Sequence, residues 1–310
     1  MLTFNFSLVR FVFHYMNRQG HKTKIENIIA HIGVGNFHRS HLAYIIDKLG
    51  NSSESIWNII GIGLMPWDFK ICNALRKQNM QYTLLMRDTY RDEVYTINSI
   101  FDFCFIPQDF LKFQELTRND KLKIISLTIT EKGYYQDSIT QNLDLNNNFI
   151  KNDLESWIPR DGLNLPKTAF GFICTILTRR RWSHSKDNQK GLTILSCDNL
   201  PSNGDTCKHS TLAFAQALDN IDPGLADWIN EKVSFPNSMV DRITPITTDK
   251  TRELVLKNYG IKDECPVISE KYLSWIIEDK FVNNIRPNWN TAFEPDSVNE
   301  SVFFVENVEP

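Results

Sequence analysis

The stretch Asn27–Ser40, with the sequence NIIAHIGVGNFHRS, decides the fold class of this chain. Its first six residues form an apolar run that leads to Gly33, as buried parallel strands do. Gly33 permits a tight turn, and Gly35 lets the backbone approach a phosphate group closely. The helix predicted to follow would point its N-terminal N–H groups at that phosphate. This order predicts a dinucleotide site at a first βα crossing, with a glycine-rich turn that binds nothing as the alternative.

Apolar runs and helical patterns alternate through the rest of the chain. Further strands are predicted at Trp57–Ile62, Tyr82–Met86, Val94–Ile100, Lys123–Ile129 and Gly191–Cys197. Helices are predicted at Leu42–Leu49, Pro66–Leu75, Phe110–Leu116, Lys167–Trp182, Asp205–Leu218, Gly224–Val233 and Thr247–Asn258. This alternation predicts an α/β protein with a doubly wound, mostly parallel sheet of the Rossmann type. Ligands of such sheets bind outside the carboxyl ends of the strands, so the residues that follow each strand are the candidates for function.

Composition excludes several classes of function. The chain has 310 residues, and its 34 Lys and Arg against 37 Asp and Glu leave a net charge of −3. That charge favours neither nucleic acid nor an anionic membrane as a partner. The apolar runs are interrupted before the ~20 residues that a membrane span needs. The six cysteines are irregularly spaced, which predicts free thiols, a reducing compartment such as the cytoplasm, and no thiolate zinc site.

Residues 1–26 differ in composition from the rest of the chain. No acidic residue precedes Glu26, whereas Arg10, Arg18, Lys22 and Lys24 are basic. Such a composition predicts a poorly ordered extension or a misplaced start codon, and a weak transit peptide is the alternative. We expect a dinucleotide-binding domain over residues 27–310, preceded by this extension.

Polar side chains that follow the predicted strands are candidates for cofactor binding. Asp68 follows the second strand, where an acidic side chain accepts hydrogen bonds from the adenosine ribose and favours NAD over NADP. An Asp in the first turn of a helix fits the same pattern equally well. Thr130 lies in a polar cluster after the strand Lys123–Ile129, and turn or capping chemistry is the alternative there. His38 and His41 form an H-x-x-H pair without a third ligand, so no metal site is predicted.

Four segments carry a resemblance to a known family: HIGVGNFHRSH (31–41), SLTITEKGYY (126–135), SCDNLPSNG (196–204) and FPNSMVDRITP (235–245). In this order they resemble the polyol-specific long-chain dehydrogenases, and most of all their mannitol 2-dehydrogenase branch. The resemblance extends from about Asn27 to Pro310 and does not cover residues 1–26. Four long motifs in the family's order make it highly specific.

The resemblance implies an NAD(P)-dependent, zinc-independent interconversion of a polyol and a ketose, such as D-mannitol and D-fructose, and Asp68 favours NAD as the cofactor. It implies that the dinucleotide segment comprises Ile29, Ala30, His31, Ile32, Gly33, Val34, Gly35, Asn36, Phe37, His38, Arg39 and Ser40. Asn199 resembles the asparagine that forms the active site beside the nicotinamide. Asp241 resembles a second polar residue of the active site, and its neighbour Arg242 is expected to be structural.

The chain also departs from the family pattern. The family's catalytic base is a lysine in a K-x5-N-x2-H motif, which follows a segment that resembles Val302–Pro310. These 310 residues contain no counterpart of that motif or of the family's helical C-terminal domain. We therefore expect impaired catalysis, and a non-catalytic, truncated NAD-binding remnant is the alternative. Lys132 and Lys280 are the lysines considered as a substitute base, and the family gives neither of them that role.

Overall fold

The computed structural model describes residues 13–14, 26–50, 56–88, 91–159, 164–183, 191–295 and 297–308. Most of residues 1–26, and with them the predicted extension or transit peptide, lie outside the described residues. The exceptions are Glu26 and β1 (Phe13–His14), and β1 pairs in parallel with β5 (Asp92–Ile97).

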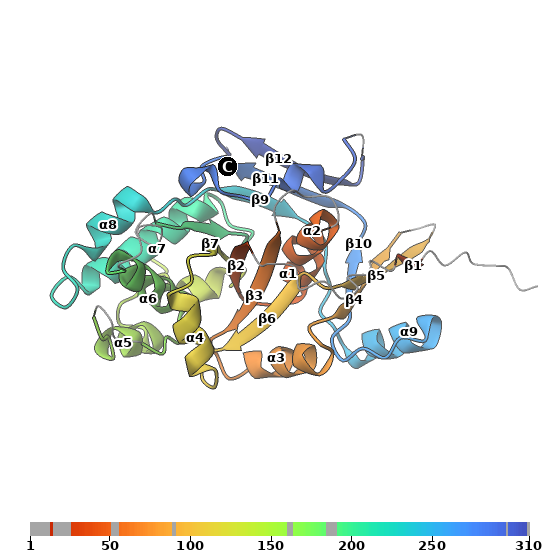
Figure 1. Cartoon of the computed structure of the whole chain (residues 1–310), viewed down its shortest axis with the longest axis horizontal. Coiled ribbons are helices and arrows are strands. Elements are labelled where there is room, and N and C mark those ends of the chain that lie inside the picture. Colours follow the sequence, from red (N-terminus) through yellow and green to blue (C-terminus); the bar gives the residue numbers. More distant parts are fainter. Residues whose placement is uncertain are drawn as a thin grey trace, which may run out of the picture.

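A five-stranded parallel sheet occupies the centre of the molecule (Figure 1). Its order is β6 (Ile100–Phe105), β3 (Trp57–Gly63), β2 (Asn27–Ile32), β7 (Leu122–Leu127) and β8 (Thr193–Ser196). Every neighbouring pair in this order is parallel. Along the chain, β3 and β6 are added on one side of β2, and β7 and β8 are then added on its other side. The prediction of a doubly wound, Rossmann-type α/β sheet is confirmed, and its switch point lies between β2 and β7.

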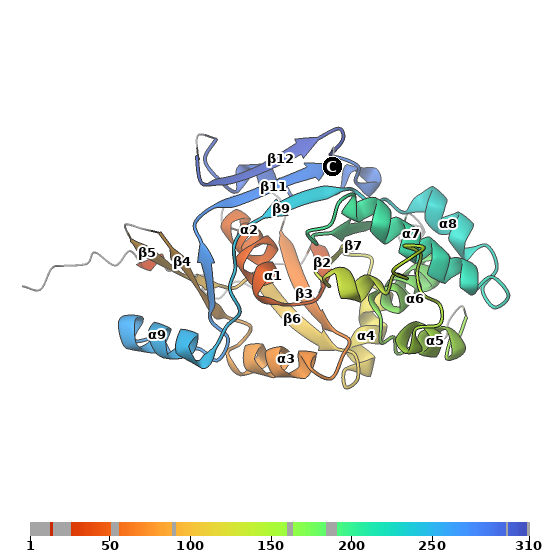
Figure 2. The same ribbon diagram turned by 180° about the vertical axis from the view of Figure 1, so that it is seen from behind.

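Helices cover both faces of this sheet (Figures 1 and 2). Alternate residues of β2 enter two separate apolar clusters, because side chains of a strand point to opposite faces. The cluster around Ile29 includes α2 (Leu42–Leu49) and α3 (Asp68–Lys77). The cluster around Ala30 includes α4 (Phe110–Thr117), α6 (Ala169–Arg181), α7 (Asn203–Ala217) and α8 (Leu225–Lys232). The other helices of the described residues are α1 (Asn36–Ser40), η1 (Glu131–Tyr134), α5 (Asn148–Glu155), α9 (Asp249–Tyr259), η3 (Val282–Asn284) and η4 (Trp289–Thr291).

Two smaller sheets flank the central one, and the sequence did not predict them. The first has the order β1, β5, β4 (Tyr82–Arg87) and β10 (Val267–Glu270), and its β4–β5 pair is antiparallel. The second has the order β12 (Glu300–Val305), β11 (Leu273–Glu278) and β9 (Ser238–Asp241), and it lies along one edge of the molecule in Figure 1.

The single strand predicted at Val94–Ile100 is wrong. The structure divides this region into β5 and β6, which belong to different sheets. The buried Ser99 lies at the break and donates a hydrogen bond to the carbonyl of Ala43, while the N–H of Asn98 binds the Asp47 carboxylate at 2.7 Å. These contacts with α2 turn the chain from one sheet into the other, and a local hydrophobic pattern contains no sign of them.

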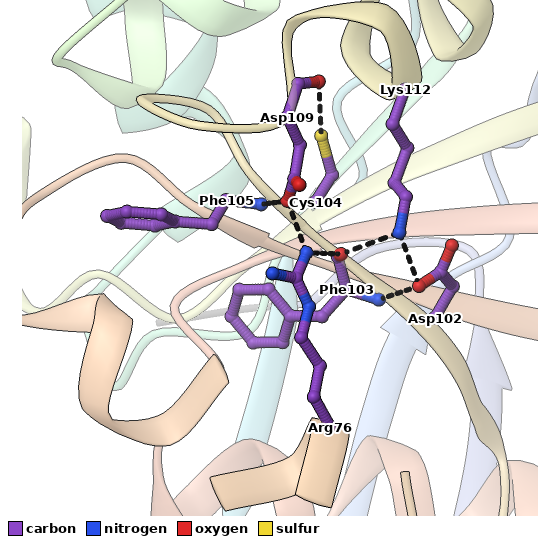
Figure 3. A network of polar contacts seen from close by, with 7 residues as sticks. All are labelled: Arg76, Asp102, Phe103, Cys104, Phe105, Asp109 and Lys112. Carbon is purple, nitrogen blue, oxygen red and sulfur yellow. Dashed lines mark hydrogen bonds and ion pairs between the residues drawn. The ribbon is translucent and has the colours of Figure 1, made fainter. Parts of the chain in front are cut away.

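Side chains protect the outer edge of β6, which ends the central sheet (Figure 3). The carbonyl of Phe103 accepts hydrogen bonds from Arg76 at 3.0 Å and from Lys112 at 3.2 Å. Arg76 also pairs with Asp109, whose carboxylate accepts the N–H of Phe105 at 2.7 Å. The exposed backbone of an edge strand is a template for unwanted pairing, and these contacts block it while tying α3 and α4 to the sheet.

Arg76→Ala is expected to lower the free energy of unfolding by about 1–2 kcal/mol, because it removes a partly buried ion pair and an edge hydrogen bond. Lys112→Ala is the matched control and should cost less, since its ion pair with Asp102 is more exposed. Urea unfolding of both variants measures the difference. An Arg76→Ala protein as stable as the unmodified chain would show that the network contributes nothing.

Candidate functional site

A cavity of about 400 Å³ opens where the loops after β2, β3 and β7 meet. Its position outside the carboxyl ends of the strands, beside the β2–β7 switch point, is where doubly wound sheets bind ligands. The lining residues are Ile32, Gly33, Val34, Gly35, Asn36, Arg39, Leu64, Met65, Trp67, Asp68, Ile71, Thr128, Ile129, Thr130, Gly133, Tyr135, Lys167 and Ala169. A second cavity of about 850 Å³ adjoins the first and shares Arg39, Trp67 and Ile71 with it.

The two glycines of the first βα turn have different roles. Gly33 has a φ of +88°, and a Cβ built on it would lie 2.1 Å from the carbonyl oxygen of Thr128, so no other residue fits. Gly35 has an extended backbone, with φ −83° and ψ −172°. A Cβ built on Gly35 meets only the carbonyl oxygen of Gly33, at 3.9 Å. Glycine at position 35 therefore keeps the cavity open rather than satisfying a backbone constraint.

Buried and half-buried side chains hold this turn. The Thr128 hydroxyl donates to the carbonyl of Gly33 at 2.7 Å, and the Nε2 of His31 lies 3.0 Å from the same hydroxyl. Because the hydroxyl proton of Thr128 is used, Nε2 of His31 carries the ring proton and Nδ1 accepts from Ser126 at 2.8 Å. Burial lowers the pKa of His31 to about 3, so the ring is neutral at pH 7. His38 stacks on His31 with ring centroids 3.5 Å apart.

Two cationic side chains lie at the cavity. Arg39 is almost completely buried, and it donates to the side chain of Asn36 at 2.6 Å and to the carbonyl of Cys265. Lys167 lines the same cavity from the segment before α6. Positive charge beside a glycine turn and the start of a helix favours a bound phosphate group.

Asp68 joins the cavity wall to the turn after β3. Its Oδ2 accepts the N–H groups of Leu64 and Met65, both at 2.9 Å. Burial raises the pKa of this carboxyl above its usual value, and the two backbone hydrogen bonds offset only part of that rise. Asp68 therefore has the structural role expected of an Asp in the first turn of a helix. Binding of the adenosine ribose by the same side chain stays a prediction.

Asn199 and Asp241 lie on neighbouring segments but do not line the cavity. Asn199 is exposed in the loop after β8, and Asp241 is exposed at the end of β9. The buried Asn203 joins the two segments, because its side-chain N–H donates to the carbonyls of Asp198 at 2.9 Å and Ser238 at 2.8 Å. Its side-chain oxygen accepts the N–H of Ser238 at 2.9 Å.

Residues 27–291 match a family model, the mannitol dehydrogenase Rossmann domain. The chain belongs to the mannitol dehydrogenase family. It is 40% identical over 262 residues to the mannitol dehydrogenase DSF1 of Saccharomyces cerevisiae, an overlap of 84% of this chain and 50% of that protein. It is 37% identical over 270 residues to the D-mannonate oxidoreductase of Escherichia coli, with 86% of this chain and 53% of that protein covered.

Among solved structures, the chain is similar to the Pseudomonas fluorescens mannitol 2-dehydrogenase in a ternary complex with NAD and D-mannitol. The TM-score is 0.79 and the sequence identity is 39%, with 92% of this chain and 54% of that chain covered. This mannitol dehydrogenase family member thus spans about half the length of the curated relatives it matches.

The structure places only part of the predicted cofactor segment at the cavity of this family member. The lining includes Ile32, Gly33, Val34, Gly35, Asn36, Arg39, Asp68 and Thr130. Ile29, Ala30, His31, His38 and Ser40 are buried behind the turn, and the half-buried Phe37 stacks on His41. These side chains support the turn, so contact with a cofactor stays a prediction for them.

Several residues at this site were not assigned a role from the sequence. Lys167 is far from the glycine turn along the chain and belongs to no motif. Asp198 and Asn203 were visible only as members of the segment SCDNLPSNG (196–204), because the backbone N–H groups that they bind belong to other segments. Arg242 has the structural contacts expected of it, since it donates to the carbonyl of Ser40 at 2.6 Å and lies over the ring of Tyr44.

Among the described residues, no group of three or more His, Cys, Asp or Glu is placed to hold a metal ion. His41 stacks on Phe37 and packs edge-on against Trp275, and its ring is buried. No helix in the described part of the chain has both the length and the apolar character to cross a membrane.

Proposed function

We propose that residues 27–310 form the NAD-binding domain of an oxidoreductase that interconverts a polyol and a ketose, of the mannitol 2-dehydrogenase type. The observation that carries the proposal is the open space above Gly35, at the switch point of the sheet. The Pseudomonas fluorescens enzyme, 39% identical to this chain, is described as a complex with NAD and D-mannitol.

The lining residues fit a dinucleotide. The backbone at Gly33–Asn36 would hold the pyrophosphate, and Arg39 and Lys167 would balance its charge. Asp68 would accept hydrogen bonds from the adenosine ribose. When bound, NAD supplies the hydride acceptor for oxidation of a secondary alcohol. Asn199 and Asp241 would hydrogen-bond the hydroxyl groups of the substrate and orient it.

The substrate is proposed as a polyol and its ketose, with D-mannitol and D-fructose the first pair to test. The relatives include mannitol dehydrogenases and a D-mannonate oxidoreductase, so a sugar acid is the next compound to assay. The six cysteines are free thiols, which supports action in a reducing compartment such as the cytoplasm.

Calorimetric titration of the purified chain with NADH, together with an assay of NADH absorbance in the presence of fructose, tests this function. We expect saturable binding of NADH. If NADH does not bind, the chain is not the NAD-binding domain that we propose.

We expect the isolated 310-residue polypeptide to bind NADH but to reduce fructose slowly. A positioned base contributes roughly 10²–10⁴-fold to such reactions. Lys132 is exposed and outside the first cavity, and Lys280 is exposed and pairs with Glu278 at 3.2 Å, so neither is placed as a base. Turnover comparable to that of a full-length relative would contradict this expectation.

Asp68 is expected to favour NADH over NADPH, because its carboxylate would repel a 2′-phosphate group. Asp68→Asn should narrow the difference between the two dissociation constants by roughly tenfold, equivalent to about 1.4 kcal/mol. Asparagine keeps an oxygen for the N–H groups of Leu64 and Met65, so the turn should survive. Tighter binding of NADPH than of NADH by the unmodified chain would show that Asp68 does not select the cofactor.

A further inference from the structure

The backbone of Thr130 is strained where it forms part of the cavity wall. Its φ is +61° and its ψ is 166°, a region that only glycine adopts without cost. A residue held there costs about 1–3 kcal/mol, and such residues cluster at ligand sites. Thr130 lines the cavity together with Gly33 and Gly35, at the point where β7 leads into η1.

One buried carboxylate holds both ends of this strained segment. Asp198, which follows β8, accepts the N–H of Thr130 on its Oδ1 at 2.7 Å. Its Oδ2 accepts the hydroxyl of Tyr134 at 3.0 Å, at the other end of η1. Tyr134 is completely buried, and its hydroxyl lies 2.7 Å from the Oγ of Ser196. Asp198 is itself only 6% exposed, whereas Thr130 is exposed.

We propose that Asp198 is a positioning residue for the cofactor: its carboxylate holds Thr130 in the strained conformation that shapes the cavity wall. This inference rests on the proposed function. Asp198 also precedes Asn199 directly, so the same contacts fix the loop that carries the predicted active-site asparagine. The Asp198–Thr130 contact joins the carboxyl ends of two neighbouring strands, β7 and β8.

The variants follow from the hydrogen bonds. Asp198→Ala removes both acceptors and takes away the side-chain partner of the Thr130 N–H. Asp198→Asn keeps a side-chain oxygen that can accept the N–H of Thr130. The new amide N–H can donate to the Tyr134 hydroxyl, and that hydroxyl can then donate to Ser196. Asp47→Ala is the matched control, because Asp47 is a buried carboxylate that accepts a loop N–H, that of Asn98, away from the cavity.

The first measurement is NADH affinity. We expect Asp198→Ala to weaken NADH binding roughly tenfold, and Asp198→Asn to recover most of that loss. Asp47→Ala should lower stability but leave the affinity unchanged. If Asp198→Ala does not fold, Tyr134→Phe takes its place, with a loss of roughly threefold expected from one missing hydrogen bond. Equal affinity in the folded Asp198 variant and the unmodified chain would overturn the proposal.

The second measurement does not depend on the cofactor. Amide hydrogen exchange in residues 128–135 should be faster in Asp198→Ala, or in its Tyr134→Phe substitute, than in the unmodified chain, with β2 unchanged. Replacing Thr130 by glycine should remove much of the stability loss caused by Asp198→Ala, because glycine adopts this backbone without strain. Absence of NADH binding in the unmodified chain would count against the proposed function alone. Unchanged exchange in residues 128–135 would overturn the role of Asp198.

Discussion

Gly35→Val is expected to weaken NADH binding by at least roughly 100-fold, equivalent to about 2.8 kcal/mol, while the chain stays folded. The extended backbone at position 35 accepts any residue, and a Cβ there meets only the carbonyl oxygen of Gly33 at 3.9 Å. The valine side chain would instead fill the space that a pyrophosphate needs in order to approach the turn. Calorimetric titration with NADH measures the loss.

Thermal unfolding is the control for Gly35→Val. The variant should unfold within a few degrees of the unmodified chain, since a Cβ at position 35 meets only the carbonyl oxygen of Gly33, at 3.9 Å. Unchanged NADH affinity in a folded Gly35→Val protein would show that this turn does not bind the pyrophosphate.

Gly33→Ala, unlike Gly35→Val, is expected to destabilise the fold. It should lower the free energy of unfolding by more than about 3 kcal/mol. The added Cβ would lie 2.1 Å from the carbonyl oxygen of Thr128, which is backbone and cannot rotate away. A φ of +88° adds strain for any residue with a side chain. Urea unfolding, or the yield of folded protein, measures this loss.

Gly260→Ala separates the two causes of the stability loss, which are the close contact with Thr128 and the positive φ. Gly260 has a φ of +69° at the end of α9, and a Cβ built there meets no atom within 4 Å. Its replacement should cost only about 1–2 kcal/mol, the penalty for the left-handed conformation alone. Equal losses for Gly33→Ala and Gly260→Ala would show that the close contact with Thr128 does not matter.

The sequence was sufficient for the parts of the fold that local chemistry determines. β2 was predicted with its exact bounds of Asn27–Ile32, because a buried parallel strand is an uninterrupted apolar run. The glycine turn and the start of the following helix were equally visible. α9 and its end at Gly260 follow from helical spacing and a left-handed cap.

Other parts depend on partners that are distant in the sequence. β9 and β10 have four residues each, and their pairing with β11 and β4 defines them as strands. The break between β5 and β6 depends on the hydrogen bond from Ser99 to Ala43, which no periodicity reveals.

The residues of the candidate site also divide into those found from the local sequence and those found only from the structure. Gly33 and Gly35 were found from their own positions in the pattern, whereas Asn199 and Asp241 came from the resemblance alone. Lys167 lines the cavity beside residues far away along the chain, and Asp198 binds the distant N–H of Thr130, so both were found only from the structure.

The central claim is that the cavity at the β2–β7 switch point binds NAD. Hydrogen exchange of the unmodified chain with and without saturating NADH tests it most directly, because the measurement locates the ligand. We predict slower exchange in residues 33–36 and 128–130, which line the cavity, and no change in β11 and β12. Protection that is absent from residues 33–36, or that appears only in the β9–β11–β12 sheet, would contradict the claim.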